Sequence, residues 1–460
     1  MIDSLRNIFH IPDLRRRVLF MFALLAVYRI GAFIPTPGIN GLALSEFFDA
    51  AQGGFLGFLN MFSGGALAQM TIFALGIMPY ISASIILQLL TVVWPYLERL
   101  SKEGEAGRKK ITQYTRYGTV VLSVIQSFGI SLGLEGLQAP SGAMVVAGGG
   151  WGFRFMTVLT LTTGTAFIMW LGEQISERGI GNGISLIIFA GIVVGIPNAI
   201  IGMVQSLMAD EMSIFTVILL LIMMIVVVGV IVFVERGQRR IPVQYAKRVV
   251  GRRMYGGQST HLPLKVNTGG VIPVIFASSI ITIPATIAQF IDIEFIQAAS
   301  RQLAYGMPLY NLLYVAAIIF FCYFYTSIIF NPVDTADNLK KHGGYIPGIR
   351  PGKRTAEYID RLLSRITFGG ALYLSAVSIL PTFLISGFNV APIPFIGPTL
   401  DSWLPSFVTQ GFGINFFFGG TSLLIVVGVA MDTVQQIESQ LIMRHYDGFM
   451  KKGRLRGRRG

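Results

Sequence analysis

Ten apolar runs, each close to the roughly 17–25 residues that cross a bilayer as an α-helix, dominate this chain. Their approximate cores are residues 18–34, 71–93, 117–133, 155–171, 184–202, 214–234, 271–290, 309–329, 368–385 and 412–431. Only 13% of the residues are charged and 53% are hydrophobic, whereas soluble domains average about 25% charged residues. The sequence therefore predicts an all-α integral membrane protein with ten transmembrane helices.

The basic residues indicate how these spans are oriented. An even number of spans places both termini on one side, and all but three of the 36 Lys and Arg fall in segments expected there. The exceptions are Arg29, Arg154 and Arg301. The opposite loops carry acidic residues, namely Glu46, Asp49, Asp210, Glu211, Asp292, Glu294 and Asp401. The positive-inside rule then predicts that both termini are cytoplasmic, and no cleavable signal peptide is expected at the start.

The spans divide into two halves of five, residues 1–208 and 209–460, at a short polar break. An odd number of spans per half means that two similar halves would be inverted relative to each other. Inverted halves commonly place a pathway at their interface near the middle of the membrane. We therefore expect two inverted five-helix halves around a pathway.

The apolar stretch at residues 55–90 is interrupted by Ser63-Gly64-Gly65, and again by Gly76 and Pro79. It predicts a short helix at about 55–68 that need not cross the membrane, followed by a crossing helix at 71–93. Non-helical backbone at membrane depth is tolerated only where protein buries it or where it lines a cavity. The short element could sit inside such a cavity, or it could be a re-entrant or surface segment that fills a gap.

Two loops on the predicted cytoplasmic side are long, and their sequence patterns predict ordered structure. In residues 235–267, the alternating RIPVQYAKRV (240–249), the glycine-containing tip GRRMYGGQ (251–258) and THLPLKV (260–266) predict a β-hairpin. In residues 331–365, a helical turn is followed by GGYIPGIRPGKR (343–354) and an amphipathic segment, 355–366. Basic loops of this kind attract anionic lipid, which suits the basic tail at 444–460. A projecting hairpin instead favours a docking site for a large acidic partner.

Residues for catalysis or metal binding are scarce. There is no phosphate-binding loop and no H-E-x-x-H motif, and the four His residues are scattered. The single Cys322 excludes an internal disulfide. GIGNG (179–183) favours a tight turn over an anion-binding nest, and Gly191 with Gly195 favours close helix packing. We expect no enzyme, metal or cofactor. Two alternative functions are a coupled solute transporter, which would need intramembrane carboxylates, and an intramembrane hydrolase, which would need a nucleophile paired with a base inside the spans.

Isoleucine recurs at helical spacing within the spans. Ile81 and Ile85 share one helix face, as do Ile184 and Ile188. Ile275 and Ile425 lie in the seventh and tenth spans. Alone, these residues would be read as ordinary lipid-compatible filler. Small polar residues that could line a wettable path or join helices lie in the same spans or in the third: Ser82, Ser84, Gln88, Gln126, Ser278 and Ser279.

Over essentially its whole length the chain resembles the SecY/Sec61-alpha family, the channel-forming subunits of protein translocases. The resemblance is carried by YRIGAFIPTPG (28–38), FLNMFSGGAL (58–67), ALGIMPYISASII (74–86), GRKKITQYTRYGT (107–119), GIGNGISL (179–186), QSTHLPLKVNTGGVIP (258–273), GGYIPGIRPGKRTAEYI (343–359) and FFFGGTSLLIVVGVAMD (416–432). The form of QSTHLPLKVN resembles the bacterial or plastid branch.

This resemblance implies an hourglass pore that opens laterally between spans two and three on one side and spans seven and eight on the other. It implies a plug that includes Phe58, Leu59, Asn60, Met61, Phe62, Ser63, Gly64 and Gly65. The constriction would be a ring of Ile81, Ile85, Ile184, Ile188, Ile275 and Ile425. The lateral gate would contain Ser82, Ser84, Gln88, Gln126, Ser278 and Ser279. Docking of the ATPase SecA or the ribosome would use Arg239, Arg240, Arg252, Arg253, Arg350, Lys353 and Arg354.

The implied partners are the SecE and SecG subunits, SecA, the ribosome, signal peptides and nascent chains, and anionic lipids, with SecDF and YidC as further candidates. The implied location is the bacterial cytoplasmic membrane.

Overall fold

The computed structural model describes residues 11–50, 60, 63–146, 148–209, 213–245, 248–250, 253–255, 260–288, 302, 307–387, 409 and 420–452. Internal contacts divide the chain into two units. The first comprises Met1–Val204, Thr286–Asp292 and Val429–Gly460, and the second comprises Gln205–Ala285 and Ile293–Gly428. Each unit is described by itself.

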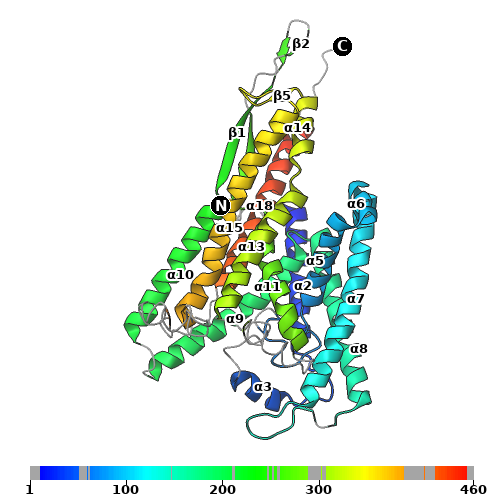
Figure 1. Cartoon of the computed structure of the whole chain (residues 1–460), viewed down its shortest axis with the longest axis vertical. Coiled ribbons are helices and arrows are strands. Elements are labelled where there is room, and N and C mark those ends of the chain that lie inside the picture. Colours follow the sequence, from blue (N-terminus) through cyan, green and yellow to red (C-terminus); the bar gives the residue numbers. More distant parts are fainter. Residues whose placement is uncertain are drawn as a thin grey trace. The chain divides into compact units, whose positions relative to one another are not determined.

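The first unit is built from helices. They are α2 (Pro12–Gly31), α3 (Gly41–Ala50), α5 (Met78–Val93), α6 (Pro95–Lys102), α7 (Glu105–Glu135), α8 (Trp151–Arg178) and most of α9 (Gly183–Met208). Helices α7 and α8 pack side by side (Figure 1) and antiparallel. An ion pair joins them at each end: Arg116 Nε lies 2.7 Å from Glu173 Oε1, and Arg154 Nη2 lies 2.6 Å from Glu135 Oε2.

Small hydroxyl residues allow α7 to pack closely. Thr115, Thr119, Ser123, Ser127 and Ser131 recur every four residues on its buried face. Each hydroxyl donates to a carbonyl three or four residues earlier in the helix. Since their polar groups are satisfied within the helix, these side chains can face apolar neighbours without the cost of an unpaired donor.

The second unit combines helices with short strands. Its elements are α10 (Ile214–Glu235), β1 (Gln238–Tyr245), β2 (Arg248–Val250), β3 (Arg253–Tyr255), β4 (Thr260–Lys265), α11 (Ile272–Ala288), α13 (Pro308–Ile329), α14 (Pro332–Lys341), β5 (Gly344–Tyr345) and α15 (Lys353–Ser386). Helix α18 (Gly420–Lys452) contributes to both units.

The predicted hairpin is confirmed. Strand β1 pairs antiparallel with β4 in a register that runs from Gln238↔Lys265 to Val243↔Thr260. The shorter strands β2 and β3 pair beyond it, and Figure 1 shows β2 at the far end of the hairpin. The alternation seen in the sequence explains the pairing, because Ile241 and Val243 are buried while their neighbours in β1 are exposed. Ile241 packs in a small core with Leu264, Ile346 and Ile359.

Each of the ten predicted apolar runs overlaps a helix among the described residues, but fewer of these helices qualify as spans. Six are long and apolar enough to cross a membrane, and α5 with α6 makes a seventh candidate that bends by 98°. The six helices correspond to the runs that begin at residues 117, 155, 184, 214, 309 and 368. The chain therefore has the all-α architecture of a membrane protein, while the count of ten spans stays a prediction.

The expected boundaries were wrong around residues 63–77. This segment is a succession of turns, so the first helix does not extend to residue 68, and the crossing helix begins at Met78 rather than at residue 71. The reason is local: Gly64, Gly65 and Gly76 adopt positive φ angles of 66°, 87° and 57°, a region that a continuing right-handed helix excludes. The amphipathic segment 355–366 and the run 368–385, which the sequence treats separately, form one continuous helix, α15.

Candidate functional site

The six isoleucines of the predicted ring lie on four helices. Ile81 and Ile85 are buried on α5, and Ile188 is buried on α9, with Ile184 half-buried one turn before it. Ile275 on α11 and Ile425 on α18 are also buried. Four of the six therefore belong to the first unit and two to the second. Their closure into one ring stays a prediction, but burial of such apolar side chains is what a dry constriction requires.

The start of α9 is held by a dense set of hydrogen bonds. The Asn182 side chain accepts from the amide of Ile184 at 3.1 Å, which caps the helix. The amide of Gly181 donates to Gln436 Oε1 at 3.0 Å, and that of Gly183 donates to Ser176 Oγ at 2.8 Å. Side chains of this protein already occupy these donors, which supports the tight-turn interpretation of GIGNG over an anion-binding nest.

The predicted gate residues fall into two groups. Ser82, Ser278 and Ser279 are buried, and the hydroxyls of Ser278 and Ser279 both donate to the carbonyl of Ile275 at 2.8 Å. Ser84, Gln88 and Gln126 are half-buried, with Gln88 Nε2 donating to Ser84 Oγ at 3.2 Å. The Gln88 Oε1 atom is buried without a hydrogen-bond partner among the described residues. An unpaired carbonyl of this kind favours contact with water or with a passing polar group.

The described part of the predicted plug is a compact turn organised around Asn60 and Ser63. The carbonyl of Asn60 accepts from the Gly65 amide at 2.9 Å and from Ser63 Oγ at 2.9 Å. The Asn60 side chain accepts from the Ala68 amide at 2.8 Å. Phe58, Leu59, Met61 and Phe62 lie outside the described residues.

The two predicted docking loops form one structure. Strand β5 pairs with β1 through Gln244↔Tyr345 and Tyr245↔Gly344, and Tyr345 Oη donates to Gln244 Oε1 at 3.0 Å. This pairing joins loops that lie about 100 residues apart, and the hydrophobic pattern of each loop alone could not reveal it. The β1, β4 and β5 strands and the start of α15 therefore form one basic platform, which carries the exposed residues Arg239, Arg240, Arg350, Lys353 and Arg354.

Glycines shape the part of this platform near Arg350. Gly348 and Gly352 have φ angles of 80° and 103°, and Thr355 Oγ1 donates to the Arg350 carbonyl at 2.9 Å. Arg350 is thus presented from a defined loop. Arg253 lies on β3, where only the backbone is described, and Arg252 lies outside the described residues.

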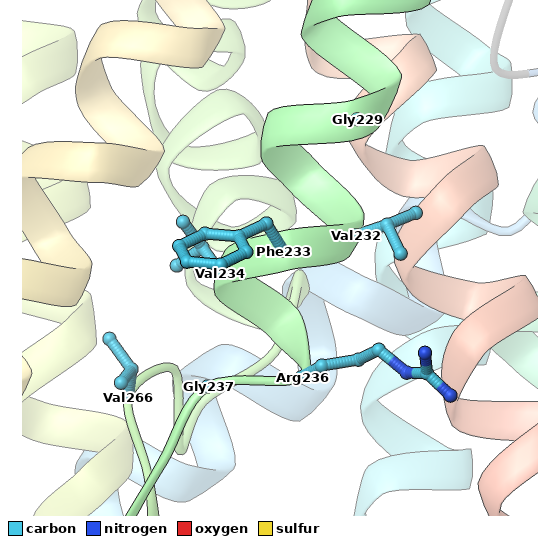
Figure 2. Close-up of a pocket in the computed structure, with 7 residues that line it drawn as sticks. All are labelled: Gly229, Val232, Phe233, Val234, Arg236, Gly237 and Val266. Carbon is cyan, nitrogen blue, oxygen red and sulfur yellow. The ribbon is translucent and has the colours of Figure 1, made fainter.

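A pocket of about 610 Å³ lies at the end of α10, where the chain continues into the hairpin. Gly229, Val232, Phe233, Val234, Arg236, Gly237 and Val266 line it, and Figure 2 shows Phe233 and Arg236 extending in opposite directions from the end of the helix. Its lining holds no nucleophile or acid–base pair. No group of three or more potential metal ligands occurs among the described residues. The features that these parts of the chain offer are buried isoleucines on four helices, a compact turn and a basic platform.

Comparison with known proteins agrees with this set of features. The family model described as SecY matches residues 71–434. The protein translocase subunit SecY of Escherichia coli K12 is 50% identical over 449 residues, covering 97% of this chain and 96% of that protein. The corresponding subunit of Pseudomonas aeruginosa is 49% identical over 451 residues, covering 97% and 95%.

Two solved structures share the fold across most of the chain. One is a SecY structure described with the statement that the plug domain stabilises the closed state of the translocation channel. It matches with a TM-score of 0.62 and 18% identity, covering 93% of this chain and 92% of that one. The other, Sec61 in the canine ribosome–channel complex from the endoplasmic reticulum, matches with a TM-score of 0.58 and 16% identity, with the same coverage.

Proposed function

The chain belongs to the SecY family, and we propose that it moves unfolded secretory proteins across the membrane and releases transmembrane segments sideways into lipid. The observation that carries this proposal is the 50% identity to a protein translocase subunit over nearly the full length of both chains. The buried isoleucines and the basic platform supply the physical parts that such a channel needs.

The proposed architecture has ten spans in two inverted halves, residues 1–208 and 209–460, around an hourglass pore. Both termini face the cytoplasm of a bacterial inner membrane, as the distribution of Lys and Arg supports. Spans two and three, together with spans seven and eight, form the seam that opens to lipid. The segment at 55–68 is the plug, and its described turn at residues 63–65 is buried or half-buried.

The isoleucine ring acts as the proposed seal. A narrow apolar constriction excludes water and ions by dewetting when no chain is inside. Isoleucine also offers a passing polypeptide no hydrogen bonds, so segments of any sequence can slide through. A polar ring would bind some substrates and would hold water when empty. The ring therefore needs large apolar side chains that are buried in the resting state, as five of the six are.

The lateral gate sorts segments by their free energy of transfer. At the centre of a helix, Leu or Ile gains about 0.3–0.6 kcal/mol on entering lipid, whereas Asp, Lys or Arg loses about 2.5–3.5 kcal/mol. Summed over a span, these terms separate insertion from export without a recognition code. Ser82, Ser278 and Ser279 suit this seam, since such small side chains let helices approach closely and separate again.

The energy for translocation comes from a partner, and the channel itself is proposed to be non-catalytic. SecA or the ribosome docks on the basic platform, where exposed cations suit an acidic protein surface or ribosomal RNA. The hairpin tip, whose sequence contains Arg252 and Arg253, is proposed to contribute to the same docking site. SecE and SecG complete the channel, signal peptides and nascent chains pass through it, and SecDF and YidC assist. Anionic lipids contact the basic cytoplasmic face.

A crosslinking experiment tests the central claim. Single cysteines replace Ile85 and Ile425 in a background in which Cys322 is serine, and a secretory polypeptide is arrested midway through export. Both positions are expected to crosslink to the arrested chain. The matched control is a cysteine at Ile225, which is 68% exposed on α10 and faces away from the core of its unit. If the control crosslinks and both ring positions do not, the proposed pathway is wrong.

A further inference from the structure

Two neighbouring side chains at the end of α2 reach the turn at residues 63–65. Arg29, one of the three basic residues outside the predicted cytoplasmic segments, donates from Nη1 to the carbonyl of Gly64 at 2.9 Å. Tyr28 donates from its hydroxyl to the carbonyl of Ser63 at 3.3 Å. Each bond spans 35 residues of sequence. Both acceptors are backbone carbonyls, so the side chains of the turn do not determine these bonds.

Aromatic contacts hold the two donors in place. The guanidinium carbon of Arg29 lies 4.6 Å from the centre of the Phe33 ring, in cation–π geometry. The Tyr28 ring stacks on Phe73 with centroids 5.8 Å apart and planes 13° apart. Because neither donor has to be ordered from a mobile state, less conformational entropy opposes the bonds. A hydrogen bond from a charged donor in a part-buried place is also among the stronger kinds.

Helix α9 closes the other side of the turn. A Cβ atom at Gly64 would lie 2.9 Å from the Cα of Gly191, so the two backbones are already in close contact. Gly191 follows Ile188 by three residues and lies on the same face of α9. Ser63, at 3% exposure, is sealed within this arrangement. The turn is therefore held between α2 and a glycine one helical turn beyond a predicted ring residue.

We propose that Tyr28 and Arg29 form a clasp that holds the turn at residues 63–65 against α9 and sets the threshold for opening the channel. The inference rests on the proposed role of this segment as the plug, and it assigns the holding force to named residues outside the segment. Tyr28 and Arg29 act as positioning residues: a signal peptide must supply enough binding energy to break their bonds before the turn can leave Gly191. Weakening the clasp should lower the threshold for every substrate alike.

The test compares Arg29→Gln, Arg29→Lys and Tyr28→Phe with the parent chain in the complete translocase. Arg29→Gln is expected to raise the resting ion leak of reconstituted vesicles by about tenfold, the equivalent of losing one charge-assisted hydrogen bond. It should also permit export of a precursor with a defective signal peptide. Arg29→Lys keeps a charged donor and should leak less, and Tyr28→Phe should have a smaller effect of the same sign. The matched control is Arg16→Gln, an exposed arginine nearer the other end of α2.

A second measurement reports directly on release of the turn. Ser63→Cys, in a chain with Cys322→Ser, is labelled by a membrane-impermeant maleimide added to the outer face. Labelling should be slow with Arg29 present and faster with Arg29→Gln. Unchanged leak and unchanged labelling in Arg29→Gln would overturn the clasp, provided that Ile425→Asn leaks in the same assay. If Ile425→Asn is also silent, the constriction proposed above fails instead, so the two failures are distinguishable.

Discussion

Replacing Ile425 by asparagine tests whether the constriction seals by excluding water. The Ile425 side chain is 0% exposed, and burying an isoleucine is worth about 1.5–3 kcal/mol. An amide in the same place without a hydrogen-bond partner costs about 1–3 kcal/mol, a cost that water in an open pore removes. The closed, dry state is therefore expected to lose about 2.5–6 kcal/mol relative to the wetted state. At about 1.4 kcal/mol per factor of ten, the population of open channels should rise by about two to four orders of magnitude.

The assay is ion conductance of vesicles that contain equal amounts of the reconstituted translocase, together with export of a precursor whose signal peptide is defective. Both should increase strongly in Ile425→Asn. The matched control is Leu424→Asn, because Leu424 is also 0% exposed and sits next to Ile425 but about 100° away around α18. An equal leak in both variants would refute the reasoning, since a general loss of packing would then account for the result. The absence of a leak in Ile425→Asn would refute it as well.

Two further predictions concern the platform and the start of α9. Arg350→Glu should impair export driven by SecA while leaving the thermal stability of the chain unchanged. The control is Lys340→Glu, at an exposed position on α14. Normal ATP-dependent export by Arg350→Glu in vesicles would exclude this loop as a docking site. Gly183→Ala should lower thermal stability by about 1–3 kcal/mol, because a Cβ there would lie 1.9 Å from the Gly172 carbonyl oxygen. Within the part of the chain that the structure describes, a Cβ at Gly195 in the same helix would meet nothing within 4 Å, so Gly195→Ala should not destabilise the chain in the same melting experiment.

Patterns that act over a few residues predict this structure well. The alternation around Ile241 and Val243 identifies β1, because a strand with one buried face requires a period of two. The GIGNG turn (179–183) and the apolar run that begins at residue 184 identify the start of α9 within two residues. The spacing of the paired isoleucines correctly places them on common helix faces. In each case the deciding interaction lies inside the segment that carries the pattern.

Contacts between distant segments decide the features that could not be predicted. The sequence marks breaks at Ser63-Gly64-Gly65 and at Gly76, but it does not show that turns continue from residue 63 to residue 77. Positive φ angles at three glycines, together with bonds from α2 to the carbonyls of Ser63 and Gly64, shape this succession of turns. Met70 even adopts a φ angle of 43° without being glycine, which surrounding structure must enforce. The joining of β5 to β1 is likewise a tertiary event. Hydropathy measures the free energy of transfer to lipid, and it carries no information on the turns at residues 63–77 or on the pairing of β5 with β1.

Helix α9 connects the proposed isoleucine ring with the turn at residues 63–65, two features that the sequence treats as separate. Ile188 and Gly191 lie on one face of it, about one turn apart, so a rigid displacement of the helix moves both by a similar amount. Moving Ile188 away from the pathway would also withdraw Gly191 from Gly64, whose backbone it contacts. Opening the ring and releasing the turn are then one event rather than two in series. Such coupling through a packed, rigid element predicts that the effects of Arg29→Gln and Ile425→Asn on the resting leak are not additive, and a double variant in the same conductance assay measures the difference.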